Sequence, residues 1–344
     1  MRLAATLLCA ALAASAADAG RPFSREMRAC ATCHPAESKP HPLTPMAHAA
    51  ETVAECGVLS SHPRLVRTLG KYSYTIERQG DRSIYKVSDG VDEIVVPVKY
   101  AMGLGAAGQT YIFEKDGKYF ESYVSYYKAL DGLDITIGDR PNPSNLVDAA
   151  GRALGAAATA ECFNCHATDS VRKERLVEES FIPGVQCEAC HGATADHLAG
   201  VGTGDARSAA MKHLGGMTAE ASAQFCGQCH RTWEYIATHG PHNTGNVRFQ
   251  PYRLTLSRCF DADDRRIACT ACHNPHQSVE TAAARYDANC QACHAARGKS
   301  GAKLCKVAAK DCSSCHMPKI ELPGSHHKFT DHNIRIVAQG AYPD

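Results

Sequence analysis

Seven copies of the pentapeptide Cys-x-x-Cys-His are the part of this sequence whose residue types and spacing could do chemistry. Composition alone, with 18 cysteines and 18 histidines among 344 residues, would give only about 0.04 copies. The two cysteines can form thioethers with a porphyrin, and the adjacent histidine is placed to ligate its iron. Zinc knuckles and disulfide frameworks also use spaced cysteines, but neither requires a histidine after every pair. The pattern therefore predicts seven c-type haem attachment sites.

Each copy supplies two cofactor-binding cysteines and one proximal iron ligand. The cofactors are therefore expected to be seven covalently attached haem c groups with their iron. The predicted haem-binding cysteines are Cys30, Cys33, Cys162, Cys165, Cys187, Cys190, Cys226, Cys229, Cys269, Cys272, Cys290, Cys293, Cys312 and Cys315. The predicted proximal ligands are His34, His166, His191, His230, His273, His294 and His316.

The 11 histidines outside the motifs exceed the seven distal iron positions that seven haems offer. This surplus favours His/His over His/Met coordination. Local context selects six distal candidates and leaves one position unassigned; they are His48, His62, His197, His276, His327 and His332. Weaker alternatives are His213, His239, His242 and His326 and the methionines Met46, Met102, Met211 and Met217. Because His276 follows a proximal histidine after two residues, we expect these two to point toward different haems.

The elements that must position these residues are unevenly distributed. Residues 20–150 carry one motif and residues 151–344 carry six; these six lie within residues 160–316, at about one motif per 26 residues. So short a segment cannot build an ordinary side-chain core. We therefore expect a multihaem cytochrome c fold, in which short helices and loops wrap stacked haems that form the core. Short helices are expected at Thr218–Phe225 and Glu280–Tyr286, each leading to a motif.

A small antiparallel β-meander is expected at about residues 72–127, between the first haem site and the other six. Pro97 indicates an edge strand or a bulge. Gly103–Gly108 matches a dinucleotide-binding fingerprint, but strand-like residues follow it where a helix is required. Those glycines instead predict a tight turn or a close backbone approach to a haem. The predicted strands are Tyr72–Ile76, Ile84–Val87, Ile94–Val98, Tyr111–Glu114 and Tyr119–Val124.

Residues 1–19 have the features of a secretory signal peptide. A basic start precedes an apolar run at Leu3–Ala14, and small residues offer cleavage after Ala16 or Ala19. The apolar run is too short to span a bilayer, and no later run is long enough for an integral membrane segment. We therefore expect a soluble, exported protein, periplasmic or secreted, which agrees with haem attachment after export.

Four segments resemble the multihaem cytochrome c superfamily: Val185–Gly192, Cys269–His276, Cys312–Lys319 and Phe329–His332. This group includes tetrahaem nitrifier cytochromes, pentahaem nitrite reductases and octahaem hydroxylamine oxidoreductases. The resemblance covers mainly residues 160–335 and implies closely stacked, mostly bis-histidine haems that conduct electrons. In the nitrite reductases a lysine replaces the proximal histidine of the catalytic haem, whereas all seven motifs here end in histidine. That difference argues against nitrite reductase activity.

Three cysteines lie outside the motifs and the signal peptide: Cys56, Cys259 and Cys305. An oxidising compartment favours a disulfide. We expect Cys259 to pair with Cys305, because both lie between motifs in the haem-dense part. Cys56 is then a buried apolar thiol, an extra iron ligand, or the site of an intermolecular bond.

Two classes of function follow from these residues. The first is an electron carrier between a redox-protein donor and a redox-protein acceptor. The second is an enzyme that transforms a small nitrogen or sulfur compound at one haem with an open distal position. Assembly into a haem filament is a third idea that rests on the number of haems alone. We expect the carrier, because histidines are plentiful and every proximal histidine is present. A net charge of +1 without a basic, aromatic patch excludes nucleic acid as a partner, and the sequence leaves the oligomeric state open.

Overall fold

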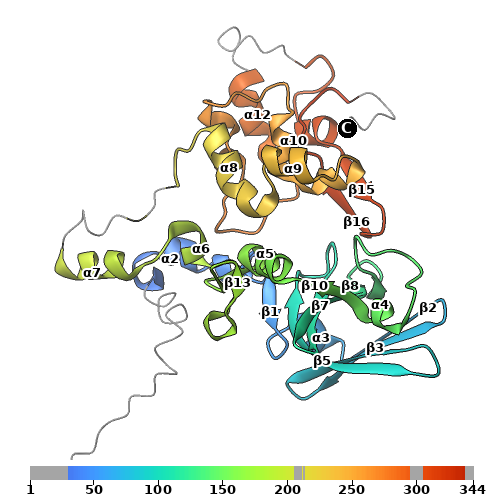
Figure 1. Ribbon diagram of the computed structural model, residues 1–344. Coiled ribbons are helices and arrows are strands. Elements are labelled where there is room, and N and C mark those ends of the chain that lie inside the picture. The colour runs from blue at the N-terminus through green and yellow to red at the C-terminus, as the bar shows by residue number, and fades with distance from the viewer. Residues whose placement is uncertain (1–29, 205–210, 212–213, 295–304, 338–344) are drawn as a thin grey trace, which may run out of the picture.

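The computed structural model describes residues 30–204, 211, 214–294 and 305–337, so the expected signal peptide lies outside the described residues. Figure 1 shows two bodies. The β body comprises residues 50–154, and the helical body comprises residues 214–337. A third part, here called the arm, contains α2 (Pro35–Ser38), α6 (Cys187–His191) and α7 (Ala195–Thr203). The helix α5 (Ala156–His166) lies between the β body and the helical body.

The β body is built on an eight-stranded antiparallel sheet with the order β10-β7-β6-β5-β4-β3-β2, and β1 pairs with β5. From β2 to β7 each strand pairs with the next one in the chain, as in a meander. The five predicted strands correspond to β3 through β7, and the sheet is larger than predicted. Its strands are β1 (Ala50–Thr52), β2 (Arg64–Leu69), β3 (Tyr72–Gln79), β4 (Arg82–Ser88), β5 (Glu93–Met102), β6 (Thr110–Lys115), β7 (Lys118–Ser122) and β10 (Gly151–Leu154).

Alternating side chains explain why these segments form a sheet with one buried face. Along β3, Tyr74 and Ile76 are buried while their neighbours reach the surface, which is the period of two that a strand requires. Opposite them lies an aromatic core. The rings of Tyr85 and Phe113 are 5.5 Å apart, and Phe113 stacks on Phe120 at 5.2 Å. This core is made of side chains and needs no cofactor.

Pro97 lies in the central strand β5, and the register explains why this position tolerates proline. Pro97 pairs with Ile84 of β4, whereas pairing with β6 begins only at Val98. A shift in register between Val98 and Tyr100 marks a bulge. The strand is therefore locally an edge at Pro97, and the missing backbone donor breaks no ladder hydrogen bond.

The glycine-rich segment between β5 and β6 forms a tight loop. Gly103 and Gly105 have φ values of +87° and +79°, where side chains are unfavourable. A Cβ atom on Gly105 would lie 2.7 Å from the ring of Tyr126 in β8 (Val124–Tyr127), which pairs with β9 (Gly132–Ile135). A strand follows the loop instead of a helix, so the structure lacks the element that a dinucleotide fingerprint requires.

Most haem motifs lie in short helices, with the histidine at or just beyond the last turn. Residues 30–33 are helical, and the second and third motifs end α5 and α6. The expected helix at Thr218–Phe225 is confirmed as the start of α8, where Thr218 Oγ1 accepts a hydrogen bond from the backbone N–H of Ala221 at 3.2 Å. The other motif helices are α8 (Ala219–His230), α11 (Cys269–Cys272), α12 (Asp287–His294) and α13 (Cys312–His316).

The expected helix at Glu280–Tyr286 is wrong in its extent. Only Ala283–Tyr286 forms a 3-10 helix there, and no side chain caps its start, so the α-helix begins at Asp287. The remaining elements are α3 (Gly57–Ser61), α4 (Leu146–Ala150), α9 (Trp233–His239), α10 (Gln250–Thr255), β11 (Ala167–Thr168), β12 (Val171–Arg172), β13 (Arg175–Leu176), β14 (Ile182–Pro183), β15 (Lys319–Leu322) and β16 (His327–Thr330).

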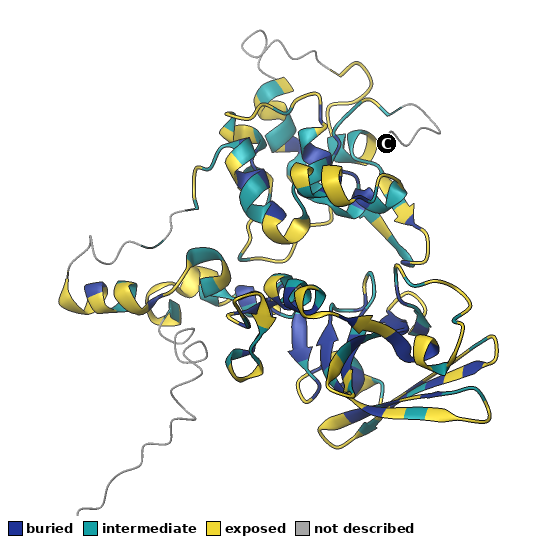
Figure 2. Cartoon of the chain, viewed as in Figure 1, coloured by how far each residue is buried: buried dark blue, intermediate teal, exposed yellow. Residues whose placement is uncertain are grey.

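Buried residues are unevenly distributed between the bodies. Figure 2 shows them concentrated in the β body, whereas most of the helical body is intermediate or exposed. Both apolar core clusters found among the described residues come from residues 50–181. The motif helices of the helical body therefore lack an apolar side-chain core of their own in the described part of the chain, whereas α5 packs Phe163 into the second cluster. This leaves the role of the core to bulky groups attached at the motifs.

Candidate metal centres

Three motif histidines each face a second imidazole at nearly the same separation. The ring centres are 6.3 Å apart for His34 and His197 and 6.1 Å apart for His191 and His276. A third pair, His273 and His332, is also 6.1 Å apart. With metal–nitrogen bonds of about 2.0 Å and ring nitrogens about 1.1 Å from the ring centre, two imidazoles on one iron lie about 6.2 Å apart. Each pair therefore has the spacing required to hold one metal ion between its rings.

These pairs join segments that are distant in the chain. His34 is the last residue of the first motif, while its partner His197 belongs to α7 in the arm. His273 and His276 are three residues apart after α11, yet one faces His332 and the other faces His191. The expectation that these two histidines point toward different haems therefore agrees with their placement.

Hydrogen bonds at Nδ1 orient the imidazoles of His166, His316 and His332, of which only His332 belongs to one of the three pairs. The Nδ1–H of His166 donates to the carbonyl of Ala49 at 2.9 Å, and that of His316 donates to the carbonyl of Arg335 at 2.8 Å. His332 Nδ1 lies 3.0 Å from the carbonyl of Thr330. A carbonyl partner fixes the Nδ1–H tautomer and leaves Nε2 unprotonated, as a metal-ligating histidine requires.

Burial keeps several of these imidazoles neutral. Desolvation lowers the pKa of His230 and His273, and it lowers the pKa of His332 to about 4. The pKa of His276 is also lowered, first by burial and then by the neighbouring His191. Because only the neutral imidazole binds a metal, burial favours the ligating form of these residues.

The seven motifs form a branched network of neighbours, in which the fourth motif adjoins the second, third and fifth. Side-chain sulfurs are within hydrogen-bonding reach between motifs one and three, two and four, four and five, and six and seven. The corresponding pairs are Cys30–Cys187, Cys165–Cys229, Cys226–Cys269 and Cys290–Cys312. Cys190 interacts electrostatically with Cys226 and Cys229, and Cys272 with Cys290, which joins motifs three to four and five to six. All seven motifs are therefore linked to one another by adjacent attachment cysteines.

Two of the predicted distal ligands have other partners in the structure. His48 Nδ1 lies 2.9 Å from Glu51 Oε1 and its Nε2 lies 2.8 Å from the carbonyl of Pro42. His62 Nδ1 lies 2.9 Å from the carbonyl of Val58, and its Nε2 lies 2.9 Å from Asp131. Both ring nitrogens of each histidine therefore have partners within the protein. That His48 and His62 ligate iron stays a prediction.

The structure also places three other predicted ligands. His327 packs edge-to-face on Phe329 with ring centres 4.9 Å apart. His230 ends α8, where its ring interacts with Gln250 and His166, and His294 ends α12. His213, a weaker candidate, lies outside the described residues.

The structure contains a buried charged cluster beside His332 that the sequence did not predict. Asp331 and Arg253 are both fully buried and form a two-pronged ion pair, with Nε and Nη2 of Arg253 at 2.9 and 3.0 Å from the carboxylate. Arg335 Nη1 donates to the same carboxylate at 2.6 Å. Burial opposes ionisation of Asp331, but the hydrogen bonds from Arg253 and from the backbone of Asn333 lower its pKa overall. The only signal in the sequence was the proximity of Asp331 and Arg335 to His332.

Two cavities border motif histidines. One of about 420 Å³ is lined by residues 270–275 and includes His273. The other, of about 230 Å³, lies where the β body meets His166. It is lined by Cys162 and His166, by Met102, Gly103, Ala107, Gly108, Thr110, Ile112, Glu121, Ser125, Tyr127, Thr136 and Ile137, and by Arg248. Arg248 Nε is buried without a hydrogen-bond partner, and burial lowers the pKa of its guanidinium. We call this second space the β-body cavity.

The cysteines outside the motifs differ from expectation. Cys259 and Cys305 are both free and exposed, so the expected disulfide is not formed. The reason is positional: Cys259 interacts with Cys290 and Cys293 of the sixth motif rather than with Cys305. Cys56 is fully buried, donates a hydrogen bond to Gln109 Oε1 at 3.3 Å, and has its pKa raised by burial to about 11. It therefore matches the expectation of a buried thiol.

The residues at the motifs fit haem on three observations of the structure. The donor set is two thiols and an imidazole at each motif, three imidazole pairs have the spacing for one metal, and the motif helices of the helical body lack their own apolar core among the described residues. The iron and porphyrin would supply one-electron redox chemistry at these positions, and these residues would hold and orient them.

Comparison with known proteins agrees with this fit. The family model described as "Cytochrome c554 and c-prime" matches residues 143–192, which include the second and third motifs. The chain is 25% identical over 162 residues to "Multiheme cytochrome MtrA" of Shewanella baltica. That match covers 45% of this chain and 40% of the relative, so the chain spans less than half of the relative's length. No solved structure matches. Together with the motifs, these similarities support a multihaem cytochrome c.

None of the helices in residues 30–204, 214–294 and 305–337 combines the length and the apolar composition that crossing a membrane requires.

Proposed function

We propose that the protein is a heptahaem c-type cytochrome that relays electrons between a redox-protein donor and a redox-protein acceptor, in the periplasm or outside the cell. The observation that carries this proposal is that attachment cysteines of neighbouring motifs interact with one another in a branched network that includes all seven motifs. Electrons entering at any one motif then have a neighbour to which they can pass, from the first motif in the arm to the seventh in the helical body.

The ligand arrangement supports a carrier more than a catalyst. We propose that His197, His276 and His332 are the distal ligands opposite His34, His191 and His273, since these rings have the spacing of axial pairs. An iron with two imidazole ligands has no position for a substrate and exchanges electrons with little rearrangement. These three sites therefore suit electron transfer alone.

The test is a reductive titration of the purified mature protein with haem counted per chain and electron paramagnetic resonance of the oxidised form. The proposal expects seven haems, reduction of all of them by one soluble donor, and low-spin signals for at least the three paired irons. A haem count well below seven, or haems that stay oxidised while their neighbours are reduced, would contradict it.

A second candidate function is the reduction or oxidation of a small nitrogen or sulfur compound, and the β-body cavity is the observation that favours it. Among the described residues, no imidazole faces His166 at the spacing of the three pairs. The cavity beside it offers hydroxyls from Ser125, Thr136 and Tyr127, which can deliver protons, and the half-buried guanidinium of Arg248, which can bind an anion.

This second function is tested with nitrite, hydroxylamine and sulfite as substrates, beside a spectroscopic search for one high-spin iron. Turnover that is lost in Arg248→Gln but retained in the exposed control Arg172→Gln would favour it. An all-low-spin protein without turnover of any of the three compounds would eliminate it.

A further inference from the structure

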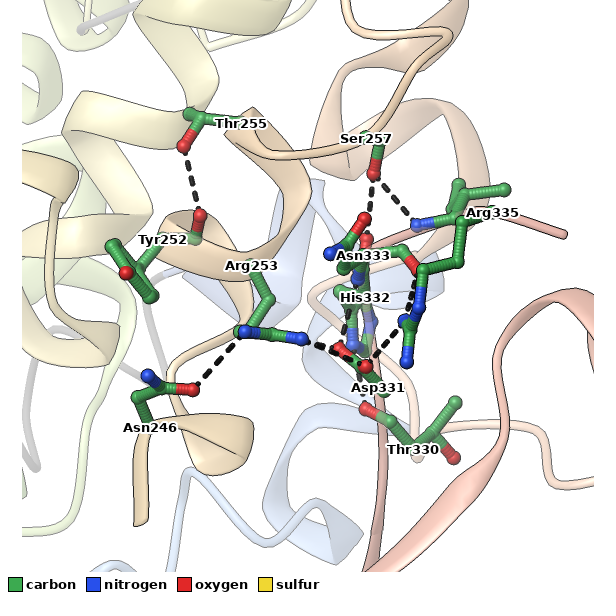
Figure 3. Close-up of polar contacts among 11 residues, drawn as sticks. Asn246, Tyr252, Arg253, Thr255, Ser257, Thr330, Asp331, His332, Asn333 and Arg335 are labelled. Carbon is green, nitrogen blue, oxygen red and sulfur yellow. Dashed lines mark hydrogen bonds and ion pairs between the residues drawn. The ribbon is translucent and has the colours of Figure 1, made fainter. Parts of the chain in front are cut away.

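The buried cluster of Arg253, Asp331 and Arg335 lies beside histidines of two of the proposed haem centres, His332 and His316. Figure 3 shows Arg253 reaching from α10 to Asp331, with Arg335 approaching the same carboxylate from the other side. Asp331 directly precedes His332, which faces His273 of the fifth motif. We call these three charged residues the Asp331 cluster.

One short segment of backbone holds the ligands of two different motifs. The carbonyl of Thr330 accepts from His332 Nδ1 at 3.0 Å, while the carbonyl of Arg335 accepts from His316 Nδ1 at 2.8 Å. The backbone N–H of Arg335 in turn donates to the carbonyl of His316 at 3.3 Å. Residues 330–335 therefore set the ring orientation at the fifth motif and at the seventh.

Two residues near the end of α10 fix that segment in place. Arg253 donates two hydrogen bonds to the carboxylate of Asp331. Both side chains are fully buried, so water does not compete for these hydrogen bonds. Ser257 Oγ donates to the carbonyl of His332 at 2.9 Å and accepts from the N–H of Ile334 at 2.8 Å. The segment is thus held at 331, 332 and 334 by side chains from a different part of the chain.

The charges of the cluster do not cancel. Two guanidinium groups share one carboxylate, so the three side chains carry a net charge of +1. Arg335 is only 12% exposed, and its Nη2 is buried without a hydrogen-bond partner. A buried guanidinium nitrogen without an acceptor is costly, and a carboxylate such as a haem propionate would satisfy it.

We propose that the Asp331 cluster is a shared positioning site for the iron ligands His332 and His316, so that it sets the reduction potentials of two haems together. The inference rests on the proposed function, because it takes the fifth and seventh motifs to carry haem. Reduction adds one electron to an iron, so positive charge nearby favours the reduced state and negative charge favours the oxidised state. These residues act through orientation and charge, and none of them is a ligand.

The experiment is a spectroelectrochemical titration of the mature holoprotein at constant pH, comparing Asp331→Asn and Arg335→Gln with the unsubstituted protein. Asp331→Asn removes a negative charge and is expected to raise two of the seven potentials. Arg335→Gln removes a positive charge and is expected to lower the same two. We expect the ratio of reduced to oxidised haem at those two sites to change roughly tenfold at a fixed electrode potential, equivalent to about 59 mV for a one-electron couple.

Controls separate electrostatics from disruption. Arg172→Gln removes the same charge from an exposed ion pair with Asp169 and is expected to leave all seven potentials unchanged. Ser257→Ala keeps the charge but removes the hydrogen bonds that hold residues 332 and 334, so it is expected to change the low-spin resonance signals of the same haems. If Asp331→Asn does not assemble, Arg335→Gln and Ser257→Ala still provide the test, because Arg335 lies nearer the surface.

The possible outcomes distinguish this inference from the proposed function. A shift of two haems, in opposite directions for the two charge variants, supports the shared site. A shift of one haem, of none, or of all seven would overturn the inference while leaving the carrier intact. An unsubstituted protein that lacks haem at the fifth or seventh motif would instead refute the proposed function itself.

Discussion

Replacing His276 with alanine is the sharpest test of the imidazole pairs. His276 and His191 have nearly parallel rings, with 8° between their planes and centres 6.1 Å apart. Two metal–nitrogen bonds of about 2.0 Å and two ring nitrogens about 1.1 Å from their ring centres add up to about 6.2 Å, so this separation is the one expected for two imidazoles on one iron. The substitution removes one of these two bonds and leaves His191 as the only imidazole on that iron.

The expected result is one high-spin iron per chain. In the oxidised protein, His276→Ala should produce a high-spin resonance that integrates to about one seventh of the total haem iron. His62→Ala is the matched control, because both ring nitrogens of His62 already have hydrogen-bond partners; it should add no high-spin signal. The comparison therefore tests a proposed ligand against a histidine whose two ring nitrogens both have hydrogen-bond partners.

A neighbouring histidine has to be excluded as a replacement ligand. His41 is buried, its Nδ1 has no hydrogen-bond partner, and it lies close enough to His276 to interact electrostatically. The double substitution of His41 and His276 by alanine prevents such rescue. If neither the single nor the double variant shows a high-spin iron, the pairing of His191 with His276 is refuted.

Three further predictions concern the described residues outside the imidazole pairs. Burial raises the pKa of Asp139 to about 6, above its unfolded value near 3.9. Ionisation of Asp139 therefore lowers the free energy of unfolding as the pH rises from about 4 to 6. Asp139→Asn should therefore raise the free energy of unfolding in urea more at pH 7.5 than at pH 4.5, with a difference of at most about 3 kcal/mol, and an equal effect at both pH values would contradict this. Labelling with a thiol reagent should modify two cysteines in the native mature protein, Cys259 and Cys305, and a third, Cys56, only after unfolding. If the native protein is not labelled, the result would instead support a disulfide between Cys259 and Cys305. Gly184→Ala should lower the thermal midpoint by an amount equivalent to roughly 2 kcal/mol or more, because Gly184 has φ +71° and its added Cβ would collide with the carbonyl of Ala47, whereas Gly57→Ala, in open space, should change it little.

The sequence was most informative where chemistry is local. A haem attachment site needs two cysteines and a histidine within five residues, so the motif can be recognised without knowing the fold. Strands with period-two alternation, such as β3 and β4, were found for the same reason. The start of α8 was found because its N-terminal cap, Thr218, is adjacent in sequence.

Pairing across the fold could not be predicted in the same way. His34 and His197 are separated by 163 positions, and only the placement of the arm brings their rings together. His62 had as good a local context as His197, but its ring is used by Asp131 and Tyr126 in the β body. The same limit hid the Asp331 cluster, because Arg253 comes from 78 residues earlier in the chain.

The β body was underestimated for a related reason. Strands β1 and β10 are short, with three and four residues, and gain stability from pairing with β5 and β7 rather than from their own pattern. Their pairing connects the β body directly to the haem motifs: Ala49, just before β1, accepts the hydrogen bond from His166, and β10 leads into α5. The sheet therefore helps to position the second motif.

The measurement that tests the central claim most directly is a reductive titration of the purified mature protein, counted in electrons per chain. A continuous relay of seven haems predicts that seven one-electron equivalents enter through a single donor and that every haem band is reduced. Uptake of fewer than seven electrons, or a subset of haems that stays oxidised at low potential, would contradict the account.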